Sequence, residues 1–223
     1  MTDLGQMRYF LGVELTLGKH GIFVNQQKYA KEILSRFGME MYNVVNSPIV
    51  PGCKVSKDEI GKQTDATKYK QIVGCLMYLL ATRPDLAFSV CLIARYTDKP
   101  TDMHLTAAKR ILRYLKGTMS LGILYKRGIE IQLQGWTDSD YVGDIDDRRS
   151  TSSYIFKHGS SAISWSSKKK PIVTLSTTEA EFVAAASCAC QVVWLKKVLH
   201  QLGRAQEKST VIFCDNNSSI KLS

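Results

Sequence analysis

The sequence predicts an α+β fold in which a β-hairpin and several helices come first and a group of strands with one long helix follows. Three observations support this prediction. Two short apolar segments flank a turn, residues 18–21, that has a glycine at each end. Apolar residues recur at helical spacing through residues 68–117. From about residue 121 the pattern changes to the alternation typical of strands, and a long helical pattern follows at 178–202.

The hairpin opens the chain, and a helix and a connecting segment follow it. Its strands are expected at residues 8–16 and 22–25. The helix is expected at residues 26–37 because its apolar residues lie on one face, and it should end at Gly38. Residues 43–65 are polar and contain prolines and glycines, which predicts a surface connection.

Three helices are expected within residues 68–117. Asp85 is expected to cap the second helix, and Thr101 or Asp102 the third. The third helix carries basic residues on the face opposite its apolar residues, namely Lys109, Arg110, Arg113 and Lys116. Such a stripe suits contact with a nucleic-acid backbone, and an ordinary solvated helix face explains it equally well.

The second part of the chain should form an antiparallel meander, the long helix and a further strand at residues 211–215. The strands of the meander are expected at residues 121–125, 129–137, 153–157 and 162–166. We therefore place a domain boundary between residues 120 and 121, with one domain at 1–120 and the other at 121–223.

Three acidic residues of the second part are the candidate site. Asp138 follows an alternating strand, Glu181 lies at the start of the long helix and Asp215 ends a short apolar strand. A strand-end Asp, a helix Glu and a second strand-end Asp can converge on one edge of a sheet. Clustered carboxylates repel one another and favour divalent cations, and next to a polyanion they indicate phosphodiester cleavage with two metal ions. Asp140 and Glu179 lie close enough to compete for these assignments.

Composition narrows the class of protein. The chain has 44% hydrophobic residues and a net charge of +10, and residues 1–125 contain 17 basic against 10 acidic residues. This excess suits binding to phosphates, and a soluble basic surface without a partner is an equal alternative. The six cysteines show no zinc-binding spacing and are expected to be reduced. No secretory signal or membrane-spanning run is expected, so the chain is expected in the cytoplasm and nucleus.

Sequence motifs in the chain follow one family's order. In the second part they are Trp136-Thr-Asp-Ser-Asp-Tyr-Val-Gly-Asp144, Asp147-Arg-Arg-Ser-Thr-Ser152, Ile163-Ser-Trp-Ser-Ser-Lys-Lys169, Leu175-Ser-Thr-Thr-Glu-Ala-Glu181 and Cys214-Asp-Asn216. In the first part they are Asp3-Leu-Gly, Arg8-Tyr-Phe-Leu-Gly-Val-Glu14, Gln27-Lys-Tyr-Ala30, Val73-Gly-Cys-Leu-Met-Tyr-Leu79, Thr82-Arg-Pro-Asp85 and Lys109-Arg-Ile-Leu-Arg-Tyr-Leu-Lys-Gly117. The chain thus resembles part of a copia-type (Ty1/copia) retrotransposon Pol polyprotein. The first part resembles the end of the reverse transcriptase and its connection region, and the second resembles the ribonuclease H domain.

The resemblance implies a fold, a reaction and a cofactor. It implies a helical connection module followed by a ribonuclease H-like mixed sheet with one long helix. Asp138, Glu181 and Asp215 correspond to the first three carboxylates that bind two Mg²⁺ (or Mn²⁺) ions for cleavage of RNA in an RNA–DNA hybrid. The family's fourth carboxylate lies further on, whereas this chain ends at Ser223, so we expect a truncated domain with weak cleavage at most. No Tyr-x-Asp-Asp polymerase motif occurs in the chain, and we expect no DNA synthesis.

Other basic residues lie near the motifs of the predicted site. Lys168, Lys169 and Lys170, between the last meander strand and the long helix, are candidates for contact with hybrid phosphates. Arg148 and Arg149 are candidates of the same kind. A solvated loop explains both groups as well as a phosphate contact does.

An alternative function follows from Arg110-Ile111-Leu112-Arg113. This tetrapeptide resembles the Arg-x-Leu-Arg motif of the RxLR effectors that oomycetes secrete into host plant cells. Such a protein would act without catalysis on host plant proteins and alter cell death or defence. In that family the motif follows a secretory signal, whereas here it lies in the middle of the chain within a predicted basic helix.

Overall fold

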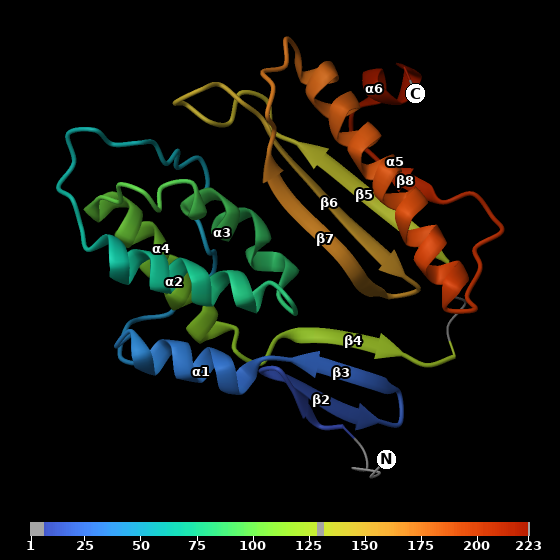
Figure 1. The fold of residues 1–223 in the computed structure, drawn as a ribbon, viewed down its shortest axis with the longest axis horizontal. Helices are drawn as coiled ribbons and strands as arrows, with labels where there is room; N and C mark the ends of the chain where they lie inside the picture. The colour runs from blue at the N-terminus through green and yellow to red at the C-terminus, as the bar shows by residue number, and fades with distance from the viewer. Residues whose placement is uncertain (1–6, 129–131, 223) are drawn as a thin grey trace. The chain divides into compact units, whose positions relative to one another are not determined.

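The computed structural model describes residues 7–128 and 132–222. The chain divides into two compact units, unit 1 (Met1–Arg127) and unit 2 (Gly128–Ser223), and each is described by itself (Figure 1). The expected motif Asp3-Leu-Gly, the first residues of the strand expected at 129–137 and the final Ser223 lie outside the described residues. The architecture is α+β, as expected.

Unit 1 contains a four-stranded antiparallel sheet in the order β1-β2-β3-β4. Its strands are β1 (Tyr9–Phe10), β2 (Val13–Gly18), β3 (Gly21–Asn25) and β4 (Gly122–Lys126). The hairpin between β2 and β3 forms as predicted, with Gly18 paired to Gly21. Gly21 has a φ of +151°, and a Cβ there would lie 2.0 Å from the carbonyl oxygen of Tyr125. Glycine at this position therefore lets β4 approach β3.

One strand of the expected meander has a different partner. The strand expected at 121–125 forms as β4, but β4 pairs with β3 of unit 1 and not with the strands that follow it. Alternation of apolar residues predicts that a strand forms without specifying its neighbour. The edge of β3 supplies a partner, and the division between the two units falls after Arg127.

The helices of unit 1 form one hydrophobic core. They are α1 (Gln27–Arg36), α2 (Ala66–Leu79), α3 (Ala87–Ala94), which follows the short 3₁₀ helix η1 (Pro84–Leu86), and α4 (Asp102–Gly117). Ile33, Ile72, Leu76, Ile111 and Leu112 are among the core residues with 1% exposure or less. The core buries the predicted apolar faces of α1, α2 and α4, which explains why these segments are helical.

The caps of these helices agree only in part with the prediction. Thr101 caps α4 as expected, and the ring of His104 closes a capping box with it. Asp85 does not cap the second helix. It lies in η1, and its carboxylate accepts hydrogen bonds of 2.9 and 2.7 Å from the guanidinium of Arg83. A nearly buried Arg83 requires an anionic partner, which accounts for this role.

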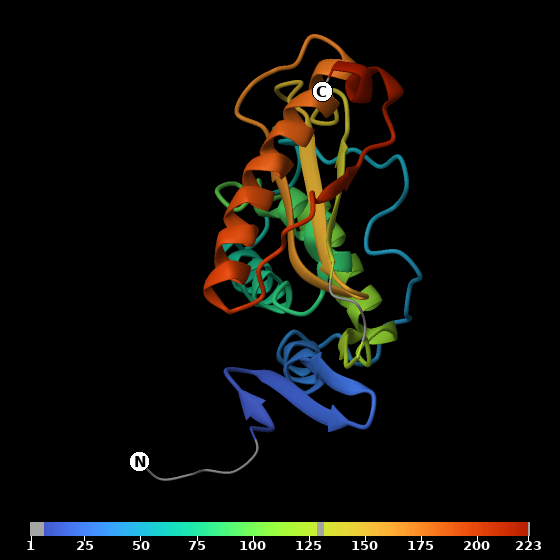
Figure 2. The same cartoon turned by 90° about the vertical axis from the view of Figure 1, so that its right-hand side faces the viewer.

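Unit 2 contains a mixed sheet in the order β7-β6-β5-β8 with a long helix across one face (Figures 1 and 2). Its elements are β5 (Leu133–Ser139), β6 (Thr151–His158), β7 (Ser161–Lys169), α5 (Thr177–Gln201), β8 (Val211–Phe213) and α6 (Asn217–Leu222). The first three strands are antiparallel, whereas β8 runs parallel to β5. The expected mixed sheet with one long helix is therefore present.

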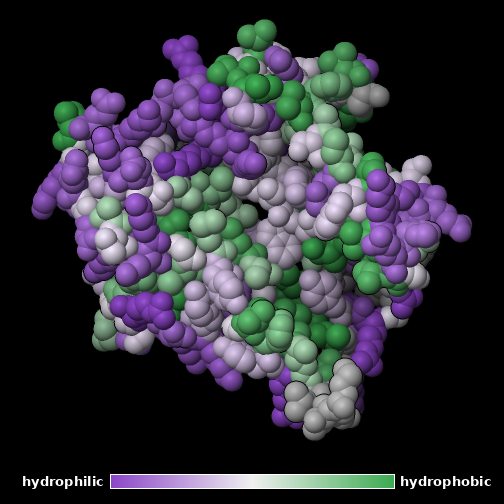
Figure 3. Space-filling view, in the orientation of Figure 1, coloured by the Kyte–Doolittle hydropathy of each residue, from purple (hydrophilic) through white to green (hydrophobic). Residues whose placement is uncertain are grey.

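The long helix α5 packs against the sheet through one face. Cys188, Val192, Leu195 and Leu199 form a core with Leu133, Phe156 and their neighbours on the strands. On its other faces α5 exposes apolar residues, for example Trp194 at 55% exposure, and Figure 3 shows such residues at the surface over α5. By length and composition α5 is apolar enough to cross a membrane, and it is the one helix of the described residues that is. No membrane-spanning run was predicted from the sequence, and the core helix of a soluble protein can have the same length and composition.

Candidate functional site

Two of the three predicted acidic residues lie side by side at one edge of the sheet in unit 2. Trp136 of β5 is the parallel partner of Phe213 of β8. Asp138 and Asp215 each lie two residues further along their segments. Because neighbouring parallel strands present their carboxyl ends at the same edge of a sheet, the two carboxylates are neighbours. The charge of Asp215 adds to the effect of burial in raising the pKa of Asp138.

Glu181 joins them from the first turns of α5. It is 6% exposed. Its Oε1 accepts a hydrogen bond of 3.1 Å from the backbone amide of Ser139, the residue after Asp138. The thiol of Cys214, the residue before Asp215, donates to Oε2 over 3.8 Å. Glu181 is thus attached to the ends of both strands, and it brings the third carboxylate to this edge of the sheet.

The electrostatics of this cluster oppose ionisation. Burial raises the pKa of Asp138, and the negative charges of Asp215 and Asp140 raise it further, while the amide of Ser139 lowers it. Burial is also the main reason that the pKa of Glu181 is raised, with a contribution from Asp138 and Asp215. A cation at this place would relieve the repulsion between the carboxylates.

The donor atoms fit a hard divalent cation. Side-chain ligand atoms of Glu181, Cys214 and Asp215 all lie within 4.8 Å of one another. The carboxylates supply the oxygen ligands that Mg²⁺ and Mn²⁺ prefer. Burial raises the pKa of the Cys214 thiol, so this group stays protonated and acts as a donor to Glu181. Glu181 and Asp215, and not Cys214, are therefore the candidate metal ligands of this group, which does not contain Asp138. Asp138 is a further candidate because the charge of Asp215 acts on it.

The two competing acidic residues have structural roles. Glu179 accepts a hydrogen bond of 2.6 Å from the amide of Leu175, and its own amide donates to the hydroxyl of Ser176, which caps α5. Asp140 accepts a hydrogen bond of 2.5 Å from the amide of Thr151 on β6. What separates them from Asp138 and Glu181 is that each carboxylate accepts a backbone hydrogen bond within its own loop or cap.

Lys170 is part of the surroundings of the site and not of an open basic patch. It is 6% exposed, and its Nζ donates to the carbonyl oxygen of Ala180, next to Glu181. Burial lowers the pKa of Lys170, and the charges of Glu181, Asp140 and Glu179 oppose this effect. The sequence pattern carried no signal for this position, because a lysine that follows two others is usually exposed.

Lys169 belongs to a network of ion pairs in the loop after β5. Its Nζ lies 2.6 Å from Asp144 and 2.8 Å from Asp147. Asp144, which is 2% exposed, also accepts hydrogen bonds from the amides of Asp146 and Asp147. Burial alone would raise the pKa of Asp144, but these hydrogen bonds and the charge of Lys169 together lower it. The network therefore holds the loop that follows the site.

The remaining basic candidates of unit 2 differ in exposure. Arg149 lies 3.6 Å from Asp147, with 43% of its side chain exposed. Lys168 and Arg148 are exposed. Of the five predicted phosphate contacts in unit 2, Lys168 and Arg148 are thus the most accessible.

The basic residues of α4 are partly engaged within unit 1. Arg113 donates from Nε to the carbonyl oxygen of Asn43 over 2.7 Å, and Lys116 donates to that of Tyr42 over 2.9 Å. Lys109 and Arg110 line a pocket, together with Arg113 and Tyr42. The predicted stripe therefore also attaches the segment after α1 to the helix.

The tetrapeptide Arg110–Arg113 is built into the core of unit 1. Ile111 is 1% exposed and Leu112 is not exposed at all. Only the two arginines reach toward solvent. A helical spacing places the middle residues on the apolar face of α4, so the motif is not an exposed peptide in this fold.

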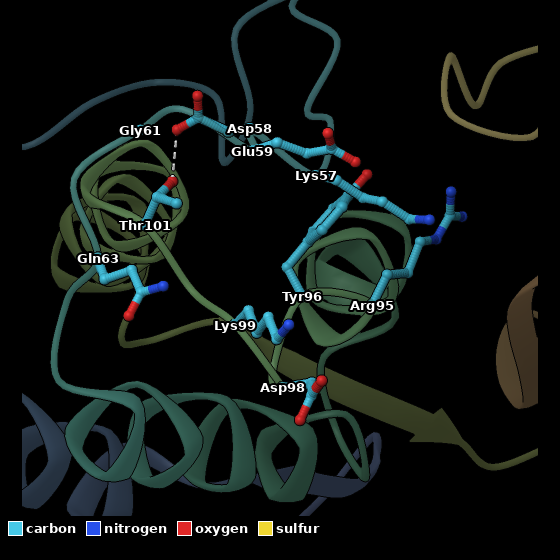
Figure 4. A pocket seen from close by; sticks show the side chains of 10 residues that line it. All are labelled: Lys57, Asp58, Glu59, Gly61, Gln63, Arg95, Tyr96, Asp98, Lys99 and Thr101. Carbon is cyan, nitrogen blue, oxygen red and sulfur yellow. Dashed lines mark hydrogen bonds between the residues drawn. The ribbon is translucent and has the colours of Figure 1, made fainter.

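A second pocket of unit 1, of about 630 Å³, is lined by charged side chains (Figure 4). Thr101 donates to Asp58 across it over 2.7 Å. The lining contains three cations and three anions, namely Lys57, Arg95, Lys99, Asp58, Glu59 and Asp98. Because these charges balance, the pocket favours neither an anionic nor a cationic ligand.

Comparison with known proteins identifies the class. The chain is 40% identical, over 96% of its length, to the retrovirus-related Pol polyprotein from transposon RE1 of Arabidopsis thaliana. It is 38% identical, over its full length, to the Pol polyprotein from transposon TNT 1-94 of Nicotiana tabacum. The protein is thus a retrotransposon Pol sequence. More specifically, it belongs to the family of copia-type Pol polyproteins, as the motifs indicated.

The chain matches only a small part of each of these Pol polyproteins. The chain spans 15% of the length of the RE1 polyprotein and 17% of that of TNT 1-94. It is also 42% identical, over 57% of its length, to the secreted RxLR effector protein 161 of Plasmopara viticola, of which it covers 90%. No family model and no solved structure matches the chain.

Proposed function

We propose that unit 2 is a ribonuclease H-like domain that binds RNA–DNA hybrids and cleaves the RNA strand slowly with Mg²⁺ or Mn²⁺. The observation that carries this proposal is the convergence of Asp138, Glu181 and Asp215 from two parallel strands and a helix. Membership of the family of retrotransposon Pol polyproteins supports the proposal. The rest of such a polyprotein is the natural context of this segment.

The residues of the site would bind the metal ions and fix the positions of the ligand atoms. Two divalent ions, when bound, would activate water and stabilise the leaving 3′ oxygen. Asp215 offers an oxygen ligand close to those of Glu181. Asp138 of β5 offers another, near enough to Asp215 for the two charges to interact. Glu181 is oriented by the amide of Ser139, which leaves its carboxylate directed at the strand ends. Lys170 adds a buried positive charge behind Glu181.

Slow cleavage follows from how Asp215 is held. The strand before it, β8, has three residues and pairs with β5 alone among the described strands. Asp215 itself is exposed. A ligand on a short edge strand is less well fixed than one on a central strand, and catalytic sites need ligands held within a fraction of an ångström.

Hybrid binding would use exposed cations and the net charge of +10. Lys168 and Arg148 are the accessible cations near the site. On unit 1, Lys109, Arg110, Arg113 and Lys116 of α4 are further candidates for contact with phosphates. We propose no polymerase activity, because the chain contains no Tyr-x-Asp-Asp motif. A Pol-derived protein of this kind would act in the cytoplasm and nucleus.

The test is cleavage of an end-labelled RNA–DNA hybrid by the full chain in Mg²⁺ or Mn²⁺. Asp138→Asn and Glu181→Gln should abolish the cleavage, while Glu207→Gln, an exposed glutamate away from the site, should leave it unchanged. EDTA should have the effect of the Asp138 substitution. Cleavage that survives both site variants comes from a contaminant, and no cleavage by folded wild-type chain would sink the enzymatic proposal.

The match to effector protein 161 of Plasmopara viticola favours a second candidate, an effector that alters host cell death without catalysis. Against it stands the burial of Ile111 and Leu112 within α4, because a motif that is read by a partner must be exposed. Expression of the chain in leaves of a host plant, beside Arg110→Ala/Arg113→Ala, tests it. A cell-death change that depends on the two arginines but not on Asp138 would favour the effector function.

A further inference from the structure

Lys170 is a buried lysine in the segment between β7 and α5, and it contacts two different parts of unit 2. It follows the last residue of β7 and is 6% exposed. Its backbone amide donates to the carbonyl oxygen of Ser150, the residue before β6, over 2.8 Å. Its Nζ donates to the carbonyl oxygen of Ala180 near the start of α5. Lys170 thus connects the start of β6 to the first turns of α5.

The burial of this ammonium group is unfavourable by itself, because the group loses its hydration. An apolar side chain of similar length would fill the same space without this cost. Burial lowers the pKa of Lys170, and among the charges that oppose this effect that of Glu181 acts most strongly, ahead of Asp140 and Glu179. The buried lysine is therefore coupled first of all to the helix residue of the candidate site.

The contacts of Lys170 and Glu181 form a closed path between two strands and the helix. Glu181 accepts a hydrogen bond from the amide of Ser139 at the end of β5. Ser139 is the partner of Ser152 on β6, so this path returns to the strand whose start is bonded to Lys170. Contacts behind a metal ligand fix its orientation, and a ligand that is loosely held binds metal less well.

From these observations we infer that Lys170 is a positioning residue of the candidate site. Its contact with Ala180 fixes the first turns of α5, so that the carboxylate of Glu181 stays on the amide of Ser139. The inference rests on the proposed function, in which Glu181 is a metal ligand. In this role Lys170 acts through Glu181, which differs from the contact with hybrid phosphates that the sequence suggested.

The test is amide hydrogen exchange of the full chain in EDTA, followed by NMR, on the wild type and on Lys170→Met. The substitution should speed exchange of the Ser139 amide at least about ten-fold, because this amide loses a charged acceptor when Glu181 is displaced. The amide of Tyr154, in a strand with a partner on each side, should change by less than about two-fold. Lys168→Met, which replaces an exposed lysine of β7, should change neither amide.

A Mg²⁺ titration by calorimetry on the same proteins measures the consequence for metal binding. Lys170→Met should bind Mg²⁺ about ten-fold more weakly than the wild type, whereas Lys168→Met should bind it as the wild type does. A wild type that binds no Mg²⁺ would contradict the proposed function. In that case the exchange of the Ser139 amide still decides whether Lys170 positions Glu181.

The exchange pattern separates positioning from a general contribution to stability. A lysine that only stabilises unit 2 would, when replaced, speed the amides of Ser139 and Tyr154 by the same factor. If Lys170→Met does not fold, Lys170→Gln, which has a shorter polar side chain, should show the same selective loss of protection at Ser139. Unchanged exchange at Ser139, an equal change at Tyr154, or unaltered Mg²⁺ affinity where the wild type binds the ion would overturn the inference.

Discussion

The carboxylate of Glu181 accepts a hydrogen bond of 3.1 Å from the backbone amide of Ser139, which connects the start of α5 to the end of β5. Through this bond one helix residue reaches the strand that carries Asp138. The thiol of Cys214 makes a second connection, from Glu181 to the segment that carries Asp215. Glu181 is therefore attached to both of the segments that carry Asp138 and Asp215.

Metal binding should stabilise unit 2 through these carboxylates. We expect Mg²⁺ to raise the melting temperature of the wild-type chain, because a ligand that binds only the folded state stabilises it. For Asp138→Asn we expect little or no increase, and in EDTA this variant should melt no lower than the wild type, since the substitution removes a repulsion from Asp215. Differential scanning fluorimetry with and without Mg²⁺ measures both. A full Mg²⁺ response in Asp138→Asn would exclude Asp138 as a ligand.

The raised pKa of Glu181 predicts a pH dependence in the absence of metal. A carboxyl whose pKa is higher in the folded than in the unfolded chain contributes stability below its usual pKa of about 4, and this contribution is lost as the pH rises through the folded pKa. In EDTA, the free energy of unfolding of the wild type should therefore fall relative to that of Glu181→Gln between about pH 4 and neutrality. Urea titrations at several pH values measure the difference. A difference that does not vary with pH would contradict the raised pKa.

Substitutions of two nearby glutamates of α5 should have different effects, one mainly on stability and the other mainly on cleavage. Glu179→Ala removes the acceptor for the amide of Leu175 and should cost about 1 kcal/mol in unfolding free energy with cleavage retained. Glu181→Gln keeps an acceptor for Ser139 and should abolish cleavage at a smaller cost in stability. Urea unfolding and hybrid cleavage on the same samples give both numbers. The reverse pattern would assign the catalytic role to Glu179.

Two neighbouring lysines make a matched pair for the loop after β5. Lys169→Met leaves the buried Asp144 without its cation and should cost about 2 kcal/mol, whereas the exposed Lys168→Met should be nearly neutral. Because the pKa of Asp144 is lowered, its contribution is present above about pH 4 and is lost as the pH falls through the folded pKa. The difference between the variants should therefore shrink in acid, as urea unfolding will show. Equal costs for the two substitutions would mean that the ion pair does not stabilise the loop.

The burial of Leu112 makes a prediction about the tetrapeptide Arg110–Arg113. Leu112→Ala should destabilise unit 1 by about 3 kcal/mol, because it leaves a cavity in the helical core. Met77→Ala, an exposed apolar residue on α2, should cost far less. Chemical denaturation followed by circular dichroism measures both variants. A neutral Leu112→Ala would indicate that the motif is exposed in solution.

The local pattern predicted most elements of the chain. The hairpin at Gly18–Gly21, the helices of unit 1 and the long helix α5 all follow from apolar spacing and turn residues. The pairing of β4 with β3 was not predictable in this way, since alternation carries no information about a strand's partner. The burial of Lys170 was not predictable for a similar reason, because it depends on Ala180, which lies ten residues further on and on another element.

By itself, the sequence determined the family, the α+β class and the three acidic residues to consider, because motifs, periodicity and residue type are local properties. Only the tertiary structure decided that Glu181, and not Glu179, meets the ends of β5 and β8. It also decided that the tetrapeptide Arg110–Arg113 is one wall of a pocket and part of a core. The physical reason is that sheet order and helix packing, which bring distant residues together, depend on long-range burial and pairing that no short pattern contains.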